Sequence, residues 1–237
     1  MPSPVRYPNG VTNSDSTSDM AQLPFLDPTK YVTWFDDFHD YDANQWVITT
    51  VEAGASSATE AVGNLDGGVL VITNDTNDTD ADYLQWSGVS GSGTAETFKF
   101  TVGKKLWFKA RWKLSAVTDL AFVLGLQITD TAPIDVTDGV FFSKADLTAA
   151  LTLEVEKNNT ATSTAVTTLV ADTYVVTSFY YDGKDAIEVF LNDTKVGTSA
   201  VTNLPDDEEL TISFGILNGA AVGHVLSIDY IFVAEER

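Results

Sequence analysis

Cysteine is absent from this chain of 237 residues, and histidine is almost absent. Without cysteine the chain has no disulfide bonds, no thiolate metal sites and no cysteine nucleophile. The two histidines, His39 and His224, cannot form a three-histidine metal centre within one chain. They are isolated in the sequence, and we expect both to be ordinary surface residues.

Positive charge is also scarce, since 13 lysines and arginines face 34 aspartates and glutamates, a net charge of −21. Such a surface repels phosphate backbones and anionic lipid heads, so we predict no nucleic-acid partner and no membrane partner. No apolar run approaches the roughly 18 residues of a membrane span. The start, Met-Pro-Ser-Pro-Val-Arg-Tyr-Pro, lacks the apolar stretch of a signal peptide, so we expect no export by the general route.

Threonine and valine dominate what is present: 30 and 25 residues, against 10 lysines, 4 glutamines and 2 methionines. An excess of β-branched residues over straight-chain helix formers favours strands. Turn signals separate fourteen predicted strands, too many for a single immunoglobulin-like sandwich. The predicted strands lie near residues 46–52, 68–73, 82–87, 96–102, 105–115, 119–129, 139–143, 151–157, 163–169, 174–181, 186–191, 194–198, 209–216 and 224–233.

Two of these segments have the clearest patterns. In 105–115, apolar residues alternate with one tryptophan and three basic residues, which predicts a strand with one face in the core. In 119–129 both sets of alternate residues are largely apolar, so we predict a central strand that is covered on both faces.

Two further segments predict local topology. Residues 174–198 read as a three-stranded meander, in which Asn192-Asp193 supplies a two-residue turn that tolerates positive φ. The last predicted strand, 224–233, is apolar on both faces and therefore interior, and its Asp229 needs a partner.

Residues 1–31 differ from the rest, because they hold five of the seven prolines and no periodic apolar pattern. We predict an extended N-terminal arm at 1–31, followed by one β-sandwich domain at 32–237 without a second core. A disordered leader is the alternative for the arm. The arm is nevertheless more apolar than a solvating tail needs, and five of its residues are candidates for contact with a partner: Tyr7, Val11, Leu23, Phe25 and Leu26.

Three segments in order along the chain carry a resemblance to a known fold family. They are Trp34-Phe35-Asp36-Asp37-Phe38 with Trp46, then Ala186 to Gly197, and Ile228-Asp229-Tyr230-Ile231-Phe232-Val233. This layout resembles the concanavalin A-like lectin/glucanase jelly roll. The resemblance implies an all-β fold of two curved antiparallel sheets, with the first and last strands paired.

A narrower resemblance concerns Arg6 to Asn13, the Phe35-Asp36-Asp37-Phe38 segment, and Asn203 to Leu210. Their layout resembles head decoration, or cement, proteins of tailed phages. The resemblance implies a virion structural protein on the capsid surface, bound to the major capsid protein and to neighbouring decoration subunits. By analogy with the family we expect a homotrimer, and no cofactor.

Catalytic chemistry finds little support in the sequence. A glucanase of this fold carries a Glu-x-Asp-x-x-Glu run or a similar one, and the nearest segment here is Glu154-Val155-Glu156, without a third acid at the family spacing. We interpret this pair as a solvated strand face. A polysaccharide lyase would need histidine, tyrosine and arginine together, but only Arg111 of the three arginines lies in a predicted strand. We predict no enzyme activity and no catalytic residue.

The acidic loop 74–82 places Asp78, Asp80 and Asp82 at alternate positions, as at the start of a calcium loop. An EF-hand would continue with glycine at position 83 and glutamate at position 89, where this chain has tyrosine and valine. Another type of calcium loop and a hydrated turn remain the alternatives, and no metal site is predicted.

Sugar binding would be helped by an exposed aromatic ring, and the candidates are Tyr83, Trp86 and Trp107. Tryptophan in a strand is more often part of a core than a platform. A carbohydrate-binding module for host-surface glycans is therefore the alternative function, with weak glycan binding expected at most.

Six of the thirteen basic residues lie between Thr97 and Thr118, a window without any acid. The surrounding domain could neutralise this window with its own acids. In the second interpretation the positive charges meet acids of a neighbouring subunit or of the capsid. On that interpretation Lys109, Arg111 and Lys113 join the arm residues as candidate contact residues.

Overall fold

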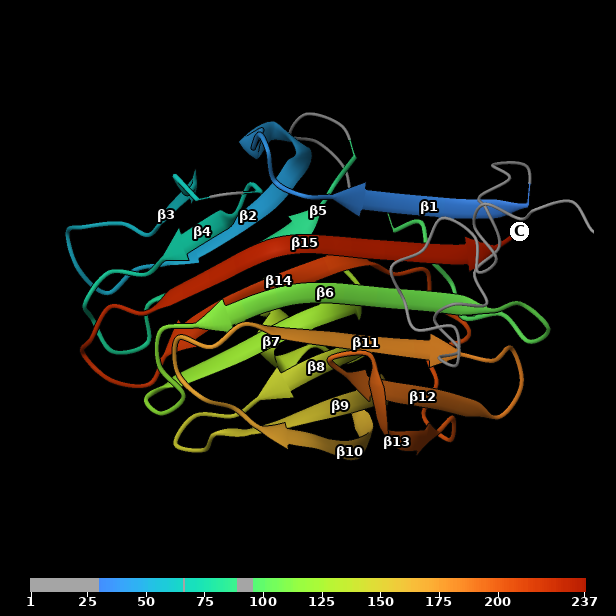
Figure 1. Ribbon diagram of the computed structural model, residues 1–237. Helices are drawn as coiled ribbons and strands as arrows, with labels where there is room; N and C mark the ends of the chain where they lie inside the picture. The colour runs from blue at the N-terminus through green and yellow to red at the C-terminus, as the bar shows by residue number, and fades with distance from the viewer. Residues whose placement is uncertain (1–29, 66, 89–95) are drawn as a thin grey trace, which may run out of the picture.

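The computed structural model describes residues 30–65, 67–88 and 96–237. Within these ranges fifteen strands form two antiparallel sheets that pack face to face (Figure 1). Apart from the strands, the described ranges contain two short 3-10 helices, η2 (Ala43–Gln45) and η3 (Pro133–Asp135). None of the helices in these ranges is long and apolar enough to cross a membrane.

We call the eight-stranded sheet sheet A. Its order is β13 (Thr194–Ala200), β12 (Ala186–Leu191), β11 (Val175–Tyr181), β6 (Leu106–Leu114), β15 (Val225–Glu236), β4 (Leu70–Thr73) and β3 (Thr59–Val62). Strand β1 (Tyr31–Asp36) also pairs with β15, from Tyr31 opposite Glu236 to Asp36 opposite Ile231. The expected pairing of first and last strands is therefore confirmed.

The seven-stranded sheet is sheet B. Its order is β10 (Thr160–Thr168), β9 (Ala150–Lys157), β8 (Gly139–Lys144), β7 (Leu120–Gln127), β14 (Thr211–Asn218), β5 (Ala81–Trp86) and β2 (Trp46–Val51). Strand β7 has the middle place, and every one of its residues is buried. The predicted central strand covered on both faces is confirmed.

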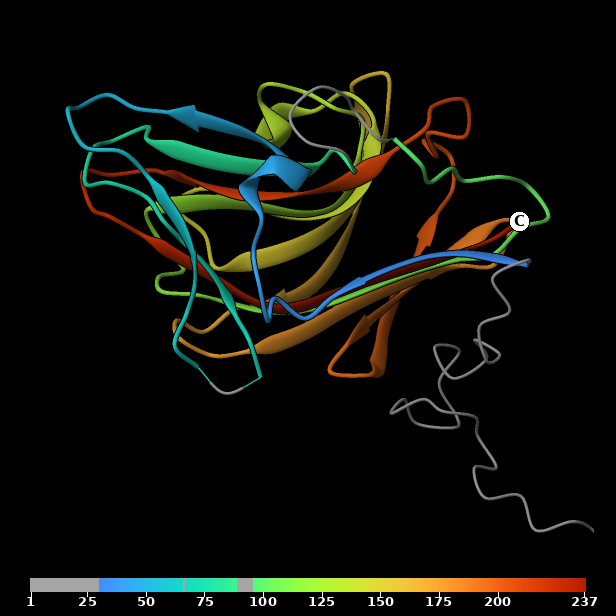
Figure 2. The same cartoon turned by 90° about the horizontal axis from the view of Figure 1, so that it is seen from above.

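Figure 2 shows the two sheets as separate layers, and one hydrophobic core fills the space between them. Strand β6 contributes alternate residues to it, and the fully buried Trp112 stacks on Phe122 of β7 with ring centroids 4.2 Å apart. The indole N–H of Trp112 donates to the hydroxyl of Thr177 at 2.9 Å. Residues from both sheets therefore share one core.

The predicted meander is also confirmed, since β11, β12 and β13 are neighbours in sheet A. Asn192 and Asp193 have φ of 49° and 62°, which suits the tight turn between β12 and β13. Asp229 lies where the register of β15 against β6 shifts, and it has the partner that the sequence required, Arg111.

One predicted strand is wrong, and two strands were missed. Residues 96–102 contribute only an isolated bridge between Phe98 and Leu210, so the alternating phenylalanines there reflect burial of an irregular segment. Strand β1 begins at the end of the proline-rich region, and β3 has the sequence Thr-Glu-Ala-Val at a sheet edge. Neither short segment has an apolar pattern long enough to be recognised without its pairing partner.

Candidate functional site

The basic residues of β6 lie on the outer face of sheet A, and each one meets an acid of the same chain. Lys109 contacts Asp193 at 2.6 Å, Arg111 pairs with Asp229, and Lys113 lies 3.4 Å from Asp172. These acids come from the β12–β13 turn, from β15 and from the loop before β11. The ring of Tyr174 lies 4.1 Å below the Arg111 guanidinium and 5.4 Å from the Lys113 ammonium.

These contacts establish that the domain neutralises the three charges itself, which is the first of the two interpretations of the basic window. Contact with a neighbouring subunit stays a prediction, since the Arg111 side chain is still 38% exposed and Asp172 is 70% exposed. The five predicted contact residues of the arm, Tyr7, Val11, Leu23, Phe25 and Leu26, lie outside the described residues.

Replacing Lys109, Arg111 and Lys113 together by serine tests both roles at once. We expect the fold to survive, because the core-facing residues of β6 are unchanged, and the free energy of unfolding to fall by about 1–3 kcal/mol as three partly exposed ion pairs are lost. Urea unfolding measures that loss, and light scattering at low and high salt measures the oligomeric state. Lys99→Ser, which removes the exposed pair with Glu209, is the matched control. An unchanged oligomer in the triple variant would contradict a contact role for the patch.

The acidic loop after β4 contains a group of carboxylates that the sequence pattern identified only in part. Glu52, Asp75 and Asp80 each place one oxygen within 4.8 Å of the others, close enough to share a metal ion. Of the three predicted aspartates only Asp80 belongs to this group, because Asp78 is exposed and Asp82 is elsewhere. Glu52 comes from the segment after β2, so no spacing within the loop could have indicated it.

Asp80 is held as a carboxylate. It is buried, which disfavours its charge, but its oxygens accept from the amide of Ala53 at 2.7 Å and from the amide and side chain of Asn77 at 3.3 and 3.2 Å. These hydrogen bonds outweigh burial and lower the pKa of Asp80. They already account for the position of the side chain, so a loop-shaping role explains it without an ion.

Asp82 lies apart from the group of Glu52, Asp75 and Asp80, and its carboxyl is in a more buried environment. It is fully buried, accepts from the Thr50 hydroxyl at 2.8 Å through one oxygen and has no hydrogen-bond donor for the other. Burial, then the neighbouring carboxyl of Glu60 and the charge of Glu52, raise the pKa of Asp82 to about 8. A carboxyl in this position holds a proton at neutral pH.

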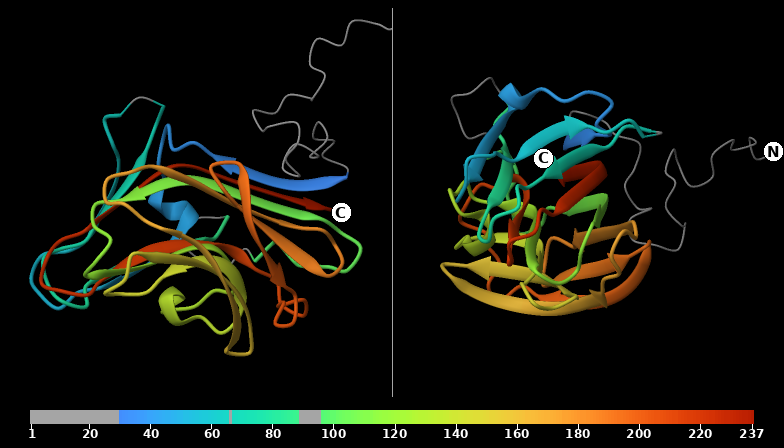
Figure 3. Two further views of the ribbon diagram at one scale, coloured as in Figure 1. Left: turned by 60° about the horizontal axis from the view of Figure 1, so that its bottom comes forward. Right: turned by 90° about the vertical axis from the view of Figure 1, so that its left-hand side faces the viewer.

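The outer face of sheet B, the other surface on which a ligand could bind, is covered over its middle strands, while the outward residues of β9 stay partly exposed. The segment containing η3 packs against β7 and β14 on this face (Figure 3). Ile134 and Val136 of this segment cluster with Val123 and Phe141. Gln85 fixes this segment, since its side chain donates to the carbonyl of Ile128 at 3.1 Å and accepts from the amide of Asp130 at 2.9 Å.

The aromatic residues that the sequence offered for sugar stacking are covered. Tyr83 and Trp107 are 3% and 1% exposed, and Trp86 is a partly buried neighbour of the main core. A β-carbon on Gly215 would lie 2.6 Å from the ring of Tyr83, so the ring lies directly against the backbone of β14. The expectation that these rings belong to packed structure is confirmed.

The acids of β9 remain partly solvated, as expected. Glu154 accepts from the hydroxyl of Ser163 on β10, and burial together with repulsion from Glu154 raises the pKa of Glu156. Their direct partners on β8 are Phe141 and Gly139, and the charges of Asp135 and Asp138 also help to raise the pKa of Glu156.

The expectation of two surface histidines is half wrong. His39 is exposed, but His224 is buried, and burial lowers its pKa despite a hydrogen bond with the backbone of Asp119. Nearby, the fully buried Lys144 donates from its ammonium to the carbonyls of Leu120 at 2.5 Å and Ala145 at 3.1 Å. Both side chains hold loops at one end of the sandwich. The sequence around His224 and Lys144 has no pattern that would have predicted their burial.

No known protein family and no curated protein matches this sequence. Solved structures do share its architecture. A β-1,3-1,4-glucanase (lichenase) derived from a mouse hindgut metagenome is similar with a TM-score of 0.58 and 12% identity over 85% of this chain and 98% of its own.

Two further structures illustrate the range of similar proteins. The carbohydrate recognition domain of Emp47p has a TM-score of 0.56 and 12% identity over 88% of this chain and 98% of its own. A protein of unknown function from Shewanella oneidensis MR-1 has a TM-score of 0.57 and 16% identity over 87% of each chain. At these identities the likeness concerns architecture and not activity. With its two antiparallel sheets, one core and paired first and last strands, the chain has the concanavalin A-like jelly-roll fold.

Proposed function

We propose that this protein is a non-enzymatic structural protein that decorates and stabilises the outer surface of a phage capsid, in contact with the major capsid protein and with neighbouring copies. The observation that supports the proposal is the η3 segment, which packs over Val123 and Phe141 in the middle of the outer face of sheet B and is fastened there by Gln85. The sequence layout and the apolar residues of the N-terminal arm supply the link to the capsid.

The mechanism is binding linkage. A protein that binds the assembled lattice, and not the free shell subunits, stabilises the lattice by mass action. An arm that reaches a second subunit adds a second contact point and raises the effective concentration of the first. A homotrimer would present three such arms together, which fits a three-fold position of the lattice.

Deletion of residues 1–30 tests the role of the arm. We expect the truncated protein to keep its melting temperature, because the prolines there prevent a regular contribution to the sheets. Its occupancy on purified capsids is expected to fall at least tenfold, since each large apolar side chain removed from a contact forfeits about 1.5–3 kcal/mol. Gel densitometry of the particles measures occupancy, and Thr152→Ser in the full chain is the control. Full occupancy after the deletion would contradict attachment through the arm.

A carbohydrate-binding module is the second candidate. It is supported by the likeness to the carbohydrate recognition domain of Emp47p and by one exposed ring, Phe35 of β1, which is 60% exposed on the outer face of sheet A. A sugar could stack on that ring.

A polysaccharide panel separates the two candidates and tests for catalysis. We expect no retardation in gels containing β-glucan or alginate, with or without calcium, and no release of reducing ends or unsaturated products. Retardation lost in Phe35→Ala but kept in Val62→Ala, another exposed apolar position, would favour the carbohydrate-binding function. Turnover abolished by Glu154→Gln or Glu156→Gln would overturn the non-enzymatic proposal.

A further inference from the structure

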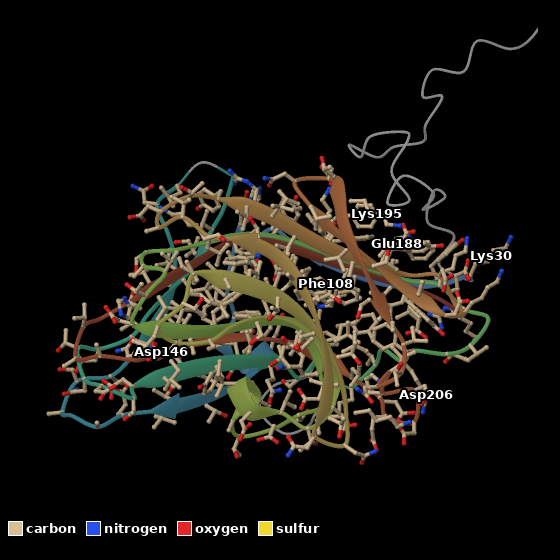
Figure 4. The ribbon with its side chains drawn as sticks, turned by 90° about the horizontal axis from the view of Figure 1, so that it is seen from below. Lys30, Phe108, Asp146, Glu188, Lys195 and Asp206 are labelled. Carbon is tan, nitrogen blue, oxygen red and sulfur yellow. The ribbon has the colours of Figure 1, made fainter. Side chains whose placement is uncertain are left out.

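Six loops lie together at one end of the sandwich, and we call this surface the loop end. Asp146 lies at this end in Figure 4, and Lys30 and Asp206 lie at the opposite end. The chain therefore enters β1 far from the loop end. The six loops comprise residues 52–58, 74–80, 115–119, 145–149, 169–174 and 219–224.

Direct contacts join neighbouring loops into one surface. The amide of Gly219 donates to the carbonyl of Asp119 at 2.8 Å. The amide of Leu169 donates to the carbonyl of Ala149, also at 2.8 Å. A β-carbon on Gly219 would overlap the carboxylate of Asp146, so these two loops lie directly against one another. The position of each of these loops is therefore fixed by its neighbours.

The loop end is acidic. None of the six loops contains a lysine or an arginine, although two lysines lie close to them. Lys144 is fully buried, and Lys113 lies beside Asp172, which is one of the loop acids. A partner of this end would therefore gain from positive charge. The loops contain seven acids: Glu52, Asp75, Asp78, Asp80, Asp119, Asp146 and Asp172.

The loop end is also apolar at its tips, which is unusual for exposed turns. Leu147, Val170 and Val222 are 76%, 65% and 52% exposed, and they come from three different loops. The loop at 219–224 reads Gly-Ala-Ala-Val-Gly-His and has no acid and no lysine. At the opposite end, by contrast, the turn between β11 and β12 reads Asp-Gly-Lys-Asp.

Leu147 is placed where leucine benefits neither the turn nor the core. Its φ is 60°, in the left-handed region that favours glycine and asparagine over a bulky residue. Its side chain is exposed, so burial does not offset the strain. Strained positions of this kind cluster at sites that contact other molecules. The leucine is therefore best explained by a contact outside the domain.

We propose that the loop end docks on a protein surface of the assembled phage capsid, in which an apolar area receives Leu147, Val170 and Val222 and basic residues surround it. This inference rests on the proposed function and names the face through which the folded domain makes its contact. An anionic membrane would be repelled by the seven acids, and a second copy of the chain would bring the same acids with it. A basic protein surface gains from both features, because it buries the apolar side chains and neutralises the acids around them.

Removing the apolar side chains tests the docking directly. The double variant Leu147→Asn and Val222→Ser keeps the loop charges, and asparagine suits the positive φ at position 147. We expect its occupancy on purified capsids that lack the native protein to be at least about tenfold lower than that of the native chain. Its melting temperature is expected to stay unchanged, because both side chains are exposed. Gel densitometry of sedimented particles measures the occupancy.

Val102→Ser is the matched control, since Val102 is 73% exposed in the loop before β6, at the opposite end. We expect it to keep full occupancy. Equal occupancy of the double variant and this control would overturn docking through the loop end and leave the capsid function in place. Absence of binding by the native chain would instead overturn the proposed function, and this inference with it. A double variant that loses self-association in light scattering but keeps its occupancy would assign the surface to contacts between copies and overturn the proposal.

The acids of the loop end are tested by salt. Occupancy of the native chain is expected to fall as NaCl rises from about 0.05 M to about 0.5 M, because salt screens contacts between charges. The double variant Asp78→Asn and Asp119→Asn is expected to lower occupancy at the lower salt and to reduce that decline. Asp185→Asn, in the charged turn at the opposite end, should change neither. Native occupancy that does not respond to salt would overturn the proposal of a basic partner surface.

Discussion

Replacing Trp112 by alanine is expected to lower the free energy of unfolding by about 3–5 kcal/mol. Trp112 is completely buried, stacks on Phe122 of the opposite sheet and donates to Thr177 of the neighbouring strand. The change removes contact between the two sheets, opens a cavity and leaves the Thr177 hydroxyl without its donor.

Urea unfolding followed by circular dichroism measures this effect. Trp112→Phe keeps a ring against Phe122 and is expected to cost less than the alanine variant. Phe35→Ala removes an exposed ring and is expected to stay within about 0.5 kcal/mol of the native protein. A loss in Trp112→Ala no larger than that in Phe35→Ala would contradict a shared core between the sheets.

Raising the pH from about 5 to about 8 is expected to destabilise the protein. The pKa of Asp82 is about 8 in the folded chain, mainly because of burial, against an ordinary value of 3.8 in the unfolded chain. Between these values the folded state holds a proton that the unfolded state has lost, so each pH unit costs up to about 1.4 kcal/mol. The stabilisation from protonated Asp82 is complete below pH 3.8, and it is lost once the pH rises above about 8.

Other buried groups also change how the stability depends on pH, but they are the same in the native chain and in the Asp82→Asn variant that tests the role of Asp82. Burial raises the pKa of Asp36, Glu156 and Glu235, and these groups add to the loss of stability as the pH rises. His224 acts in the opposite direction, because burial lowers its pKa and its neutral form is favoured in the fold. Stability gained by His224 is therefore lost as the pH falls below about 6.5.

Asp82→Asn isolates the contribution of Asp82, since asparagine cannot ionise and still offers an oxygen to Thr50. We expect its stability to decline much less between about pH 5 and about pH 8 than that of the native chain. Asp78→Asn changes an exposed acid of the same loop and should leave the decline unchanged. Parallel curves for the native chain and Asp82→Asn would show that Asp82 ionises normally in the fold.

The ion pairs on the outer face of sheet A limit how the basic residues can act in an assembly. Lys109, Arg111 and Lys113 each have an acid beside them, so a neighbour gains from this face only where exposed charge remains. The candidate contact residues of the arm are apolar, so their contact with a partner does not require an ion pair within the domain to be broken. Attachment through apolar arm residues is for this reason the stronger part of the capsid proposal.

The local features of this protein were determined by its sequence. Strand β6 shows its buried face through strict alternation, β7 shows two buried faces through a continuous apolar run, and Asn192-Asp193 shows its turn through residues that tolerate positive φ. Each of these patterns depends on residues within a few positions of one another, so the physics of the pleat and of the turn is visible in the chain.

Tertiary structure alone decided which side chains meet. Lys109 and Asp193 are 84 residues apart, Arg111 and Asp229 are 118 apart, and Glu52 reaches Asp80 from another loop. Three other features also arise from elements that are distant in sequence. They are the packing of the η3 segment on sheet B, the burial of Trp107 on the outer face of sheet A and the raised pKa of Asp82. Such contacts follow from the order and register of strands in the two sheets, which no local pattern specifies, because pairing energy depends on both partners at once.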